Sequence, residues 1–290
     1  MGDLIAAMER ALQALSSGEV VQPTRAIVPI TEHAGFLGSM PAYASGQLGA
    51  KLVTFFPDNQ GIPTHHAVIV LFRADTGEPV AIMDGRLITE MRTGAVSAVA
   101  TRMLAREDAS ILAILGSGAQ ARSHLEALRL VRQFREVRVW SPRHAGAFAR
   151  EFGVHEASSP EHAVRGADVI VVATTSRTPV LFGDWLSPGV HINAVGAVRP
   201  EWRELDDAVL RAAKLYVESR EAASCESGDV RAAGGIVAEI GEVIGGTKPA
   251  RQSDEEITLF KSVGVAVEDL ASAALVFRQV GAETGESRLR

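Results

Sequence analysis

The sequence of 290 residues contains a single cysteine, Cys225, so the chain cannot form an internal disulfide. A lone cysteine fits a reducing compartment, and we expect a cytoplasmic protein in which Cys225 is an ordinary small residue. No apolar run reaches the roughly 18 residues of a membrane-spanning helix, and the N-terminus lacks the basic start and apolar core of a secretory signal. The net charge of −6 argues against nucleic acid or an anionic membrane as the main partner.

The composition is otherwise that of a globular protein, with 47% hydrophobic and 22% charged residues. The length suffices for one large domain or two ordinary ones. The pattern changes near residue 107, so we predict two domains. The first comprises residues 1–106, with residues 255–290 packing back on it as a long helix over Glu255–Val280, and the second comprises residues 107–254.

The first part is predicted to be β-rich. A helix over residues 3–16 precedes it, with apolar residues on one face and Gly18 as its stop. The turn Asp75–Gly77 separates the last two of the short β-like runs and predicts a hairpin. These runs are Val20–Val21, Ala26–Ile30, Lys51–Phe56, Ala67–Phe72 and Val80–Met83. A second helix is predicted over residues 87–105, with Leu87, Ile88, Met91, Ala95, Ala98 and Val99 facing inward.

The second part alternates between strand-like and helical patterns. Ser159 and Pro160 have the residue types of a helix N-cap and first helical position. The alternation predicts an α/β fold with a Rossmann-type, doubly wound parallel sheet. Its predicted strands are Ile111–Leu115, Val137–Trp140, Val169–Ala173, Ile192–Val195 and Leu215–Val217.

A glycine-rich turn follows the first of these strands and opens a helical pattern. It reads Gly116-Ser117-Gly118-Ala119-Gln120-Ala121, which is G-x-G-x-x-A in a strand–turn–helix setting. The first glycine permits the tight turn, the second lets the backbone approach a pyrophosphate, and the small last residue lets helix and strand pack closely. The helix N-terminus then offers free N–H groups to the anion. We therefore predict a dinucleotide site.

The end of the second strand bears on which dinucleotide binds. Sites that prefer NAD usually carry a carboxylate there, which holds the ribose 2′-hydroxyl. Here Ser141-Pro142-Arg143 follows Trp140 instead, and Arg143 can pair with a 2′-phosphate while Ser141 donates a hydrogen bond. The pattern favours NADP(H), with NAD(H) as the alternative.

Three basic residues, Arg25, Lys51 and Arg92, sit among apolar neighbours in the first part. Arginine is the best two-point receptor for a carboxylate, although each of these residues taken singly also fits an ordinary surface side chain. His65 and His66 are adjacent, but alternation along a strand would point them to opposite faces, and no third ligand has suitable spacing. We therefore do not predict a metal site.

Taken together, several stretches across nearly the whole chain resemble the ornithine cyclodeaminase/mu-crystallin family, most nearly its mu-crystallin branch. They are Met40-Pro41-Ala42-Tyr43, Met83-Asp84-Gly85, Ile88-Thr89 with Arg92-Thr93, Gly116–Gln120, Ile192–Ala197, Arg199-Pro200, Arg203-Glu204-Leu205-Asp206-Asp207, Glu226-Ser227-Gly228-Asp229, Phe260-Lys261-Ser262 and Glu268-Asp269.

The resemblance implies a homodimer whose subunit contact is the β-rich part, with a substrate pocket between that part and the Rossmann domain. It implies that Arg25, Lys51, Arg92 and Glu226 bind the substrate. It also implies cofactor contacts at Thr64, His65, Arg92, Gly116, Ser117, Gly118, Ala119, Gln120, Ser141, Arg143, Thr174, Val195, Gly196 and Ser262.

The activity implied is NAD(P)H-dependent reduction of a small imino acid, reversible as oxidation of an amino acid. In this hypothesis Arg25 and Arg92 clamp the substrate carboxylate, and Lys51 polarises the substrate or relays a proton. Glu226 then stabilises the iminium nitrogen. Two alternatives stay open, an amino-acid cyclodeaminase and a non-catalytic protein that binds NADPH and a small ligand. Val198 stands where cyclodeaminases of the family carry an aspartate, which argues against the first alternative.

Overall fold

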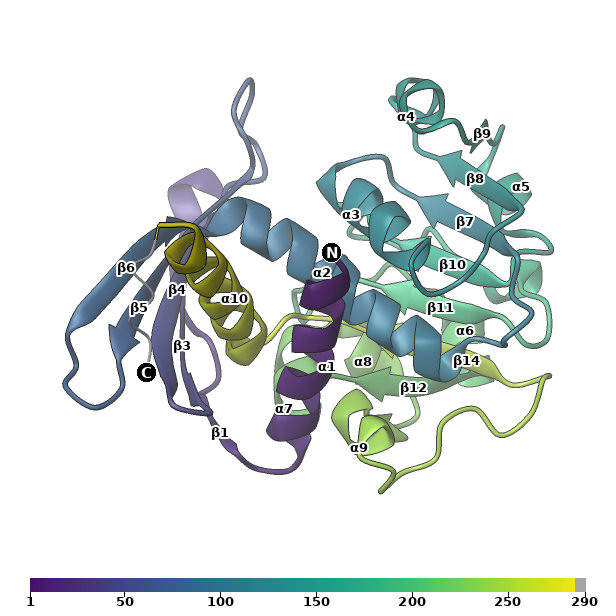
Figure 1. Ribbon diagram of the computed structural model, residues 1–290. Helices are drawn as coiled ribbons and strands as arrows, with labels where there is room; N and C mark the ends of the chain where they lie inside the picture. The colour runs from purple at the N-terminus through teal and green to yellow at the C-terminus, as the bar shows by residue number, and fades with distance from the viewer. Residues whose placement is uncertain (285–290) are drawn as a thin grey trace.

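The computed structural model of the chain describes residues 1–284 and contains two β-sheets, which are connected through helix α2 (Gly85–Leu104) (Figure 1). The sheet formed by the first part of the chain is antiparallel, and the other sheet is parallel. This is the predicted combination of a β-rich part with a Rossmann-type fold. Within the described residues, no helix is both long and apolar enough to cross a membrane.

The antiparallel sheet has the strand order β1-β3-β4-β5-β6, with β2 paired to β3. The predicted hairpin joins β5 to β6, as expected. β3 was not predicted, because Gly35, Gly38 and Pro41 break its apolar pattern although its inward residues are buried. The strands are β1 (Val20–Val21), β2 (Ala26–Ile30), β3 (Gly35–Ala44), β4 (Gln47–Phe55), β5 (His65–Arg73) and β6 (Pro79–Asp84), and the 3-10 turn η1 (Thr31–His33) lies between β2 and β3.

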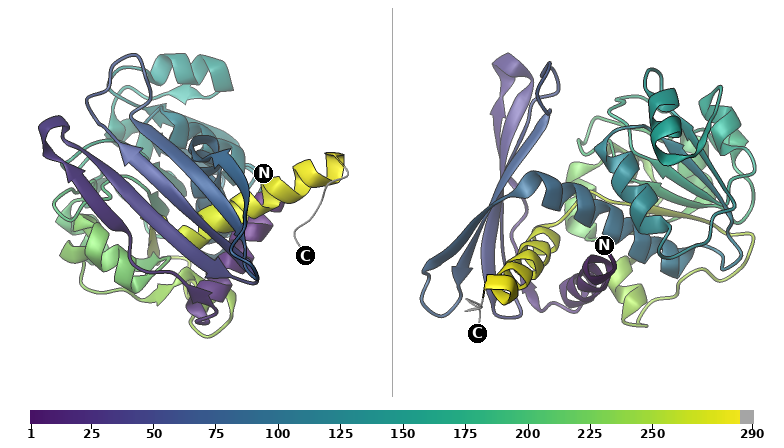
Figure 2. Two further views of the ribbon diagram at one scale, coloured as in Figure 1. Left: turned by 90° about the vertical axis from the view of Figure 1, so that its left-hand side faces the viewer. Right: turned by 45° about the horizontal axis from the view of Figure 1, so that its top comes forward.

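Helix α10 (Ala266–Thr284) and helix α2 cover one face of this sheet (Figure 2). Gly49 of β4 allows α10 to approach closely, since a Cβ at this position would lie 2.9 Å from Leu270 Cδ1. No helix among residues 1–284 covers the other face, which Figure 2 shows toward the viewer in its left panel. The sheet therefore keeps one face for the core and presents the other at the surface.

The predicted first helix is present as α1 (Gly2–Ser16), which packs against α2, α10 and α9 (Ile240–Ile244). The second predicted helix is α2, but the expectation that Leu87 faces inward was wrong, since its side chain is 58% exposed. The buried face of the first turns of α2 carries Thr89, Arg92 and Thr93 instead. In this part of α2 the polar residues face inward, so the apolar pattern did not identify the buried face.

The parallel sheet has the strand order β13-β12-β14-β11-β10-β7-β8-β9. Alternate residues of β7 and β10 contribute to two separate hydrophobic clusters, one on each face of the sheet. This two-sided burial is what a doubly wound sheet requires. The strands are β7 (Ile111–Leu115), β8 (Glu136–Trp140), β9 (His155–Glu156), β10 (Val169–Val172), β11 (His191–Ala194), β12 (Ala213–Val217), β13 (Ala238–Glu239) and β14 (Ile257–Lys261).

Short helices and turns connect these strands. Ser159 caps α5 by accepting a hydrogen bond from the His162 N–H, and Pro160 is the first helical residue, as predicted. The connecting helices are α3 (Ala119–Leu128), α4 (Ala145–Phe152), α5 (Pro160–Val164), α6 (Asp207–Ala212), α7 (Arg220–Glu226) and α8 (Gly228–Ala232), together with the 3-10 turn η2 (Gly183–Trp185).

The prediction of one helix over Glu255–Val280 was wrong in its first part. Residues Ile257–Lys261 form β14, which lies between β12 and β11 in the parallel sheet and is almost fully buried. Gly264, at φ +76°, separates this strand from α10. The predicted C-terminal segment therefore serves both sheets, and its residues 285–290 lie outside the described part. The division into two domains stays a prediction.

Candidate functional site

The glycine-rich turn lies at the carboxyl edge of the parallel sheet, between β7 and α3. Gly116 has φ +119°, and a Cβ there would lie 2.2 Å from the Ala173 carbonyl oxygen, so only glycine fits. Gly118 is the N-cap residue of α3 without a side-chain cap, and a Cβ there would meet nothing within 4 Å. The start of α3 thus lies beside open space and no side chain caps its first N–H groups, as an anion site requires.

Most predicted cofactor residues lie along this same edge, because the carboxyl ends of parallel strands meet there. Ser141 follows β8, and its Oγ lies 2.8 Å from Ser117 Oγ of the turn. Arg143 is exposed nearby. Thr174 follows β10, Val195 and Gly196 follow β11, and Ser262 follows β14. The strand order reverses between β7 and β10, where doubly wound sheets bind ligands.

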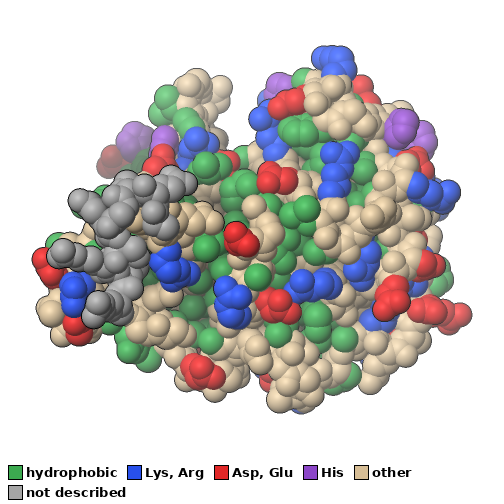
Figure 3. All heavy atoms as spheres, viewed as in Figure 1, with side chains coloured by type: hydrophobic (Ala, Val, Ile, Leu, Met, Phe, Trp, Pro, Cys, Tyr) green, Lys and Arg blue, Asp and Glu red, His purple; other side chains and the backbone are tan. Residues whose placement is uncertain are grey.

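A cavity of about 160 Å³ lies between the two sheets, in the hollow that Figure 3 shows between the two halves of the molecule. The structure brings Arg25, Lys51 and Arg92 to it from three different segments. His65, Gln120, Val195 and Ser262 also line it, so it adjoins the predicted cofactor edge, whereas Thr64 is absent from its lining.

Lys51 and Arg92 are held by a carboxylate that the sequence did not single out as a site residue. Lys51 Nζ lies 2.5 Å from Asp269 Oδ2, and Arg92 Nε lies 3.2 Å from Asp269 Oδ1. Arg92 Nη1 also pairs with Glu268 Oε2 at 2.8 Å. All four side chains are buried. The first turn of α10 therefore supplies the carboxylates that pair with the two basic side chains.

Burial changes the protonation of two groups in this cavity. Desolvation lowers the pKa of Lys51 from 10.5 to about 8, although Asp269 opposes the shift. Burial, aided by the nearby Lys51 and Arg92 cations, lowers the pKa of His65 to about 4. His65 is thus neutral at pH 7, whereas Lys51 is mostly charged but can release its proton. His66 points to the exposed side of the strand, as its alternation predicted.

Arg25 and Ser262 are fixed by the segment between β14 and α10. Arg25 Nη2 donates to the carbonyl oxygens of Val263 and Gly264 at 3.2 and 3.0 Å. Ser262 Oγ donates to the buried Glu218 carboxylate at 2.5 Å, which leaves its oxygen lone pairs as acceptors for a ligand. Glu218 had no place in the sequence-based site, because only the fold brings it next to Ser262.

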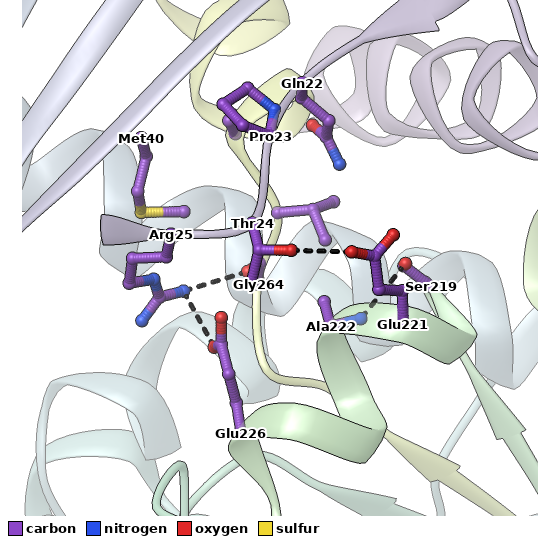
Figure 4. Close-up of a pocket in the computed structure, with 12 residues that line it drawn as sticks. Gln22, Pro23, Thr24, Arg25, Met40, Ser219, Glu221, Ala222, Glu226 and Gly264 are labelled. Carbon is purple, nitrogen blue, oxygen red and sulfur yellow. Dashed lines mark hydrogen bonds and ion pairs between the residues drawn. The ribbon is translucent and has the colours of Figure 1, made fainter. Parts of the chain in front are cut away.

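Glu226 lies behind Arg25, with its Oε2 atom 3.4 Å from Arg25 Nη2 (Figure 4). Burial raises the pKa of its carboxyl group, and Arg25 opposes this shift. Glu226 lines a smaller adjoining pocket of about 40 Å³ rather than the cavity that holds Lys51. Its predicted action on a substrate nitrogen therefore stays a prediction that depends on Arg25 moving aside.

Part of the cavity wall is aromatic and comes from both halves of the chain. Phe36 and Phe55 belong to the antiparallel sheet, and Trp202 belongs to the loop after β11. The Phe55 and Trp202 rings meet edge to face with centroids 6.5 Å apart, and the Arg199 guanidinium lies 4.3 Å from the Phe36 centroid. Sequence reasoning missed this wall, since no local pattern joins residues so distant in the chain.

The similarity to known proteins includes both sheets and the cavity between them. The family model described as "Ornithine cyclodeaminase/mu-crystallin family" matches residues 1–284. The chain is 50% identical over 286 residues to the Mus musculus protein named ketimine reductase mu-crystallin, and this match covers 94% of the chain and 91% of that protein.

Two solved structures are also similar. The Thermococcus litoralis Δ1-pyrroline-2-carboxylate reductase in complex with NADH and L-proline has a TM-score of 0.94 and 40% identity, and covers 98% of this chain and 94% of its own. An archaeal alanine dehydrogenase dimer with bound NAD has a TM-score of 0.90 and 35% identity, covering 100% of this chain and 94% of its own.

Proposed function

Because this chain belongs to the ornithine cyclodeaminase/mu-crystallin family, we propose that it is an NAD(P)H-dependent oxidoreductase that reduces the C=N bond of cyclic 2-imino acids. The observation that carries the proposal is the buried Lys51–Asp269–Arg92 cluster, which faces the cavity beside the open glycine-rich turn. Similar proteins include a ketimine reductase, Δ1-pyrroline-2-carboxylate reductases and an alanine dehydrogenase. The reverse reaction oxidises an amino acid.

The turn fits a dinucleotide because the start of α3 has no side-chain cap and a Cβ on Gly118 would meet only open space. When bound there, the nicotinamide supplies the hydride that adds to the imine carbon. Ser141 and Arg143 after β8 support NADP(H) over NAD(H), since no carboxylate stands there to repel a 2′-phosphate. The NADH and NAD complexes of two relatives keep NAD(H) as the alternative.

Arg92 and Arg25 bind the substrate carboxylate through donors that the protein leaves free. Arg92 uses Nε and Nη1 on Asp269 and Glu268, which leaves Nη2. Arg25 uses Nη2 on backbone carbonyls, which leaves Nη1. Two fixed arginines set both the position and the tilt of the substrate.

Lys51 supplies the proton that the reaction needs besides the hydride. Its pKa of about 8 is low enough for a proton to pass from Nζ to the imine nitrogen at neutral pH. The iminium formed is the better electrophile, and Asp269 stays beside the neutral amine until solvent returns the proton. Glu226 pairs with Arg25 at 3.4 Å, so in the same proposal it steadies the substrate nitrogen only if substrate binding shifts Arg25 away from it.

The apolar side of the cavity supports a ring-shaped substrate body. Phe36, Phe55 and Trp202 offer flat contact area opposite the polar cluster. Val198 also lines the cavity, so no carboxylate stands at that position to receive a side-chain amine. This supports a reductase rather than a cyclodeaminase.

The uncovered face of the antiparallel sheet supports a homodimer. Its outward residues include Leu37, Leu52, Val68 and Ile82, which form an apolar surface on neighbouring strands. The variant Leu52→Glu should give monomers by light scattering after gel filtration. Ile62→Glu, an exposed apolar position outside the strands, serves as the matched control and should leave the oligomer intact. The single cysteine supports a cytoplasmic location.

The direct test follows NADPH absorbance with purified protein. The substrates are Δ1-piperideine-2-carboxylate, Δ1-pyrroline-2-carboxylate, and pyruvate with ammonia or methylamine. We expect oxidation of NADPH with the two cyclic imines. Lys51→Ala should lose turnover while calorimetry still detects NADPH binding. A protein that binds NADPH but oxidises it with none of these substrates would refute the reductase proposal.

A further inference from the structure

A second buried ion cluster lies beneath the loop that follows β11, outside the residues assigned above to substrate chemistry. It consists of Lys261, Asp229 and Glu204, whose side chains are at most 1% exposed. They come from three stretches that carry the family resemblance, and sequence reasoning gave no role to any of the three residues. The fold brings the end of β14, helix α8 and the segment before α6 together at this point.

The cluster holds one backbone atom of the loop directly. Lys261 Nζ donates to the Gly196 carbonyl oxygen and lies 3.2 Å from Asp229 Oδ2. Asp229 Oδ1 in turn accepts hydrogen bonds from the backbone N–H groups of Glu204 and Leu205, at 3.1 and 3.2 Å. The lysine, the aspartate and the loop thus form one connected network.

Glu204 supports the same loop from below and ties it to β10. Its Oε1 atom accepts from the N–H and Oγ of Thr174, at 2.9 and 2.5 Å. A Cβ on Gly196 would lie only 2.3 Å from Glu204 Oε2, so the glycine backbone rests on the carboxylate. Oε2 has no hydrogen-bond partner among the described residues. Gly196 is therefore required for contact with Glu204 rather than for an unusual φ angle.

Further contacts fix the rest of the loop. Ala197 adopts a left-handed conformation with φ +50°, which a non-glycine residue keeps only when its surroundings hold it. The Gly228 N–H donates to the Arg199 carbonyl oxygen at 3.0 Å, and a Cβ on Gly228 would lie 2.4 Å from the Trp202 carbonyl oxygen. This held loop carries Val195, Val198, Arg199 and Trp202 into the cavity.

Burying charged groups costs desolvation free energy, and well-packed apolar side chains in the same space would often stabilise the fold as well or better. A purely structural role therefore does not account for this cluster. The loop lies where the nicotinamide half of a dinucleotide would reach from the Gly116–Gln120 turn, at the ends of β10, β11 and β14. We propose that Lys261, Asp229 and Glu204 are positioning residues that fix the Gly196 backbone as the support of the nicotinamide ring for hydride transfer. This rests on the proposed function.

The proposal separates nucleotide binding from the orientation of its reactive ring. The proposed pyrophosphate site is the turn at Gly116–Gln120, which the cluster does not touch. Glu204→Ala and Gly196→Ala should therefore keep the Kd for NADPH within about threefold of the wild-type value, as for loss of a peripheral contact. Both should lower kcat by about 10- to 100-fold, the effect of displacing a reacting group by about 1 Å. Their bound NADPH should also differ from the wild type in fluorescence emission.

The conservative variant Glu204→Gln keeps the shape of the side chain and its acceptor for Thr174. It should restore most of kcat and of the NADPH fluorescence. Burial raises the pKa of Glu204 to about 7, against the opposing effects of Lys261 and Thr174 and with the added effect of Asp229. The neutral glutamine side chain therefore resembles a form of Glu204 that the wild type already populates near pH 7, so the fluorescence of bound NADPH should show no step near this pH in either protein.

Asp168→Asn serves as the matched control. Asp168 accepts from the Ser110 and Ile111 N–H groups and pairs with Arg106 at 2.6 Å, at the opposite edge of the same sheet. This variant should lower Tm without changing kcat or the fluorescence of bound NADPH. If Glu204→Ala and Gly196→Ala behave in the same way as this control, the cluster is structural only and the proposal is overturned.

The fluorescence measurement needs no turnover, so the two proposals can fail separately. A wild-type protein that binds NADPH but reduces no imine overturns the proposed function. In that case, a changed emission of NADPH in Glu204→Ala and Gly196→Ala still supports the positioning of the ring. Emission identical to the wild type in both variants overturns the positioning role, whatever the turnover.

Discussion

The substitution Asp269→Asn tests the polar cluster, because one carboxylate holds both Lys51 and Arg92. Two unit charges about 4 Å apart attract by about 4 kcal/mol at an effective dielectric constant of 20. Lys51 Nζ and Asp269 Oδ2 are closer than this, at 2.5 Å. The variant removes this attraction and leaves Arg92, which keeps its contact with Glu268, as a positive neighbour of Lys51.

The pKa of Lys51 should therefore fall below its value of about 8. About 1.4 kcal/mol corresponds to one pKa unit, and we expect a fall of about one unit or more after the surroundings relax. Lys51 acts in its protonated form in the proposed mechanism, so activity falls as the pH rises through its pKa. In Asp269→Asn this decline should begin at lower pH, and acidification should restore activity relative to the wild type.

The same substitution should lower stability. Removing one partner of a buried ion pair costs about 3–5 kcal/mol, which corresponds to a fall in Tm on the order of 10 °C. Calorimetry should still detect NADPH binding, since the Gly116–Gln120 turn is not part of this cluster.

The assay is the pH profile of kcat/KM for the cyclic imine that the wild type reduces fastest. Asp75→Asn is the matched control, because Asp75 pairs with Arg73 at the exposed hairpin. It should leave the profile and Tm unchanged. An alkaline limb that stays near pH 8 in Asp269→Asn would contradict the assignment of that limb to Lys51.

Three further predictions concern the cofactor and pH. Gly118→Val should abolish NADPH binding in calorimetry, because its side chain would occupy the open space over the start of α3; tight binding by the variant would place the nucleotide elsewhere. Arg143→Ala should weaken NADPH about tenfold and NADH little, as measured by KM for each, the loss expected for one charge-assisted phosphate contact; equal losses would remove the 2′-phosphate contact. Burial raises the pKa of Glu268 from 4.5 to about 8, so the folded protein binds more protons than the unfolded chain, and stability from this residue falls as pH rises from about 4.5 to about 8. Glu268→Gln should flatten this decline in Tm, and the control Glu161→Gln, at an exposed position, should not. Parallel plots of Tm against pH for the wild type and both variants would show that Glu268 does not titrate in this range.

Local sequence patterns were sufficient to predict strands that are buried on both faces and a turn that requires glycine. β7 and β10 are short apolar runs of the kind that a parallel sheet covered on both faces holds, and β7 matches its predicted bounds. Gly116 identified its turn because the close approach of the Ala173 carbonyl oxygen requires the absence of a side chain, whereas a Cβ on Gly118 would meet only open space at the start of α3.

Local patterns failed where tertiary contacts override them. β3 contains glycine and proline that favour a loop, yet pairing with β4 along its whole length makes it a strand. The run at Ile257–Lys261 precedes a helix and was read as part of it, but its place between β12 and β11 makes it a central strand. Leu87 was expected inside because it is apolar, but it is exposed because the buried face of this part of its helix is polar.

The amino-acid sequence by itself determined the glycine-rich turn, the doubly wound pattern and three of the basic residues of the cavity. It could not assign Asp269, Glu218 or Glu204 to the site, because a carboxylate shows its partners only when distant segments fold together. The tertiary structure decided which charges meet: Lys51 and Asp269 are 218 positions apart in the chain, yet their side-chain atoms lie 2.5 Å apart. Charges become functional through such contacts, since burial and pairing set their pKa values and the directions of their free donors.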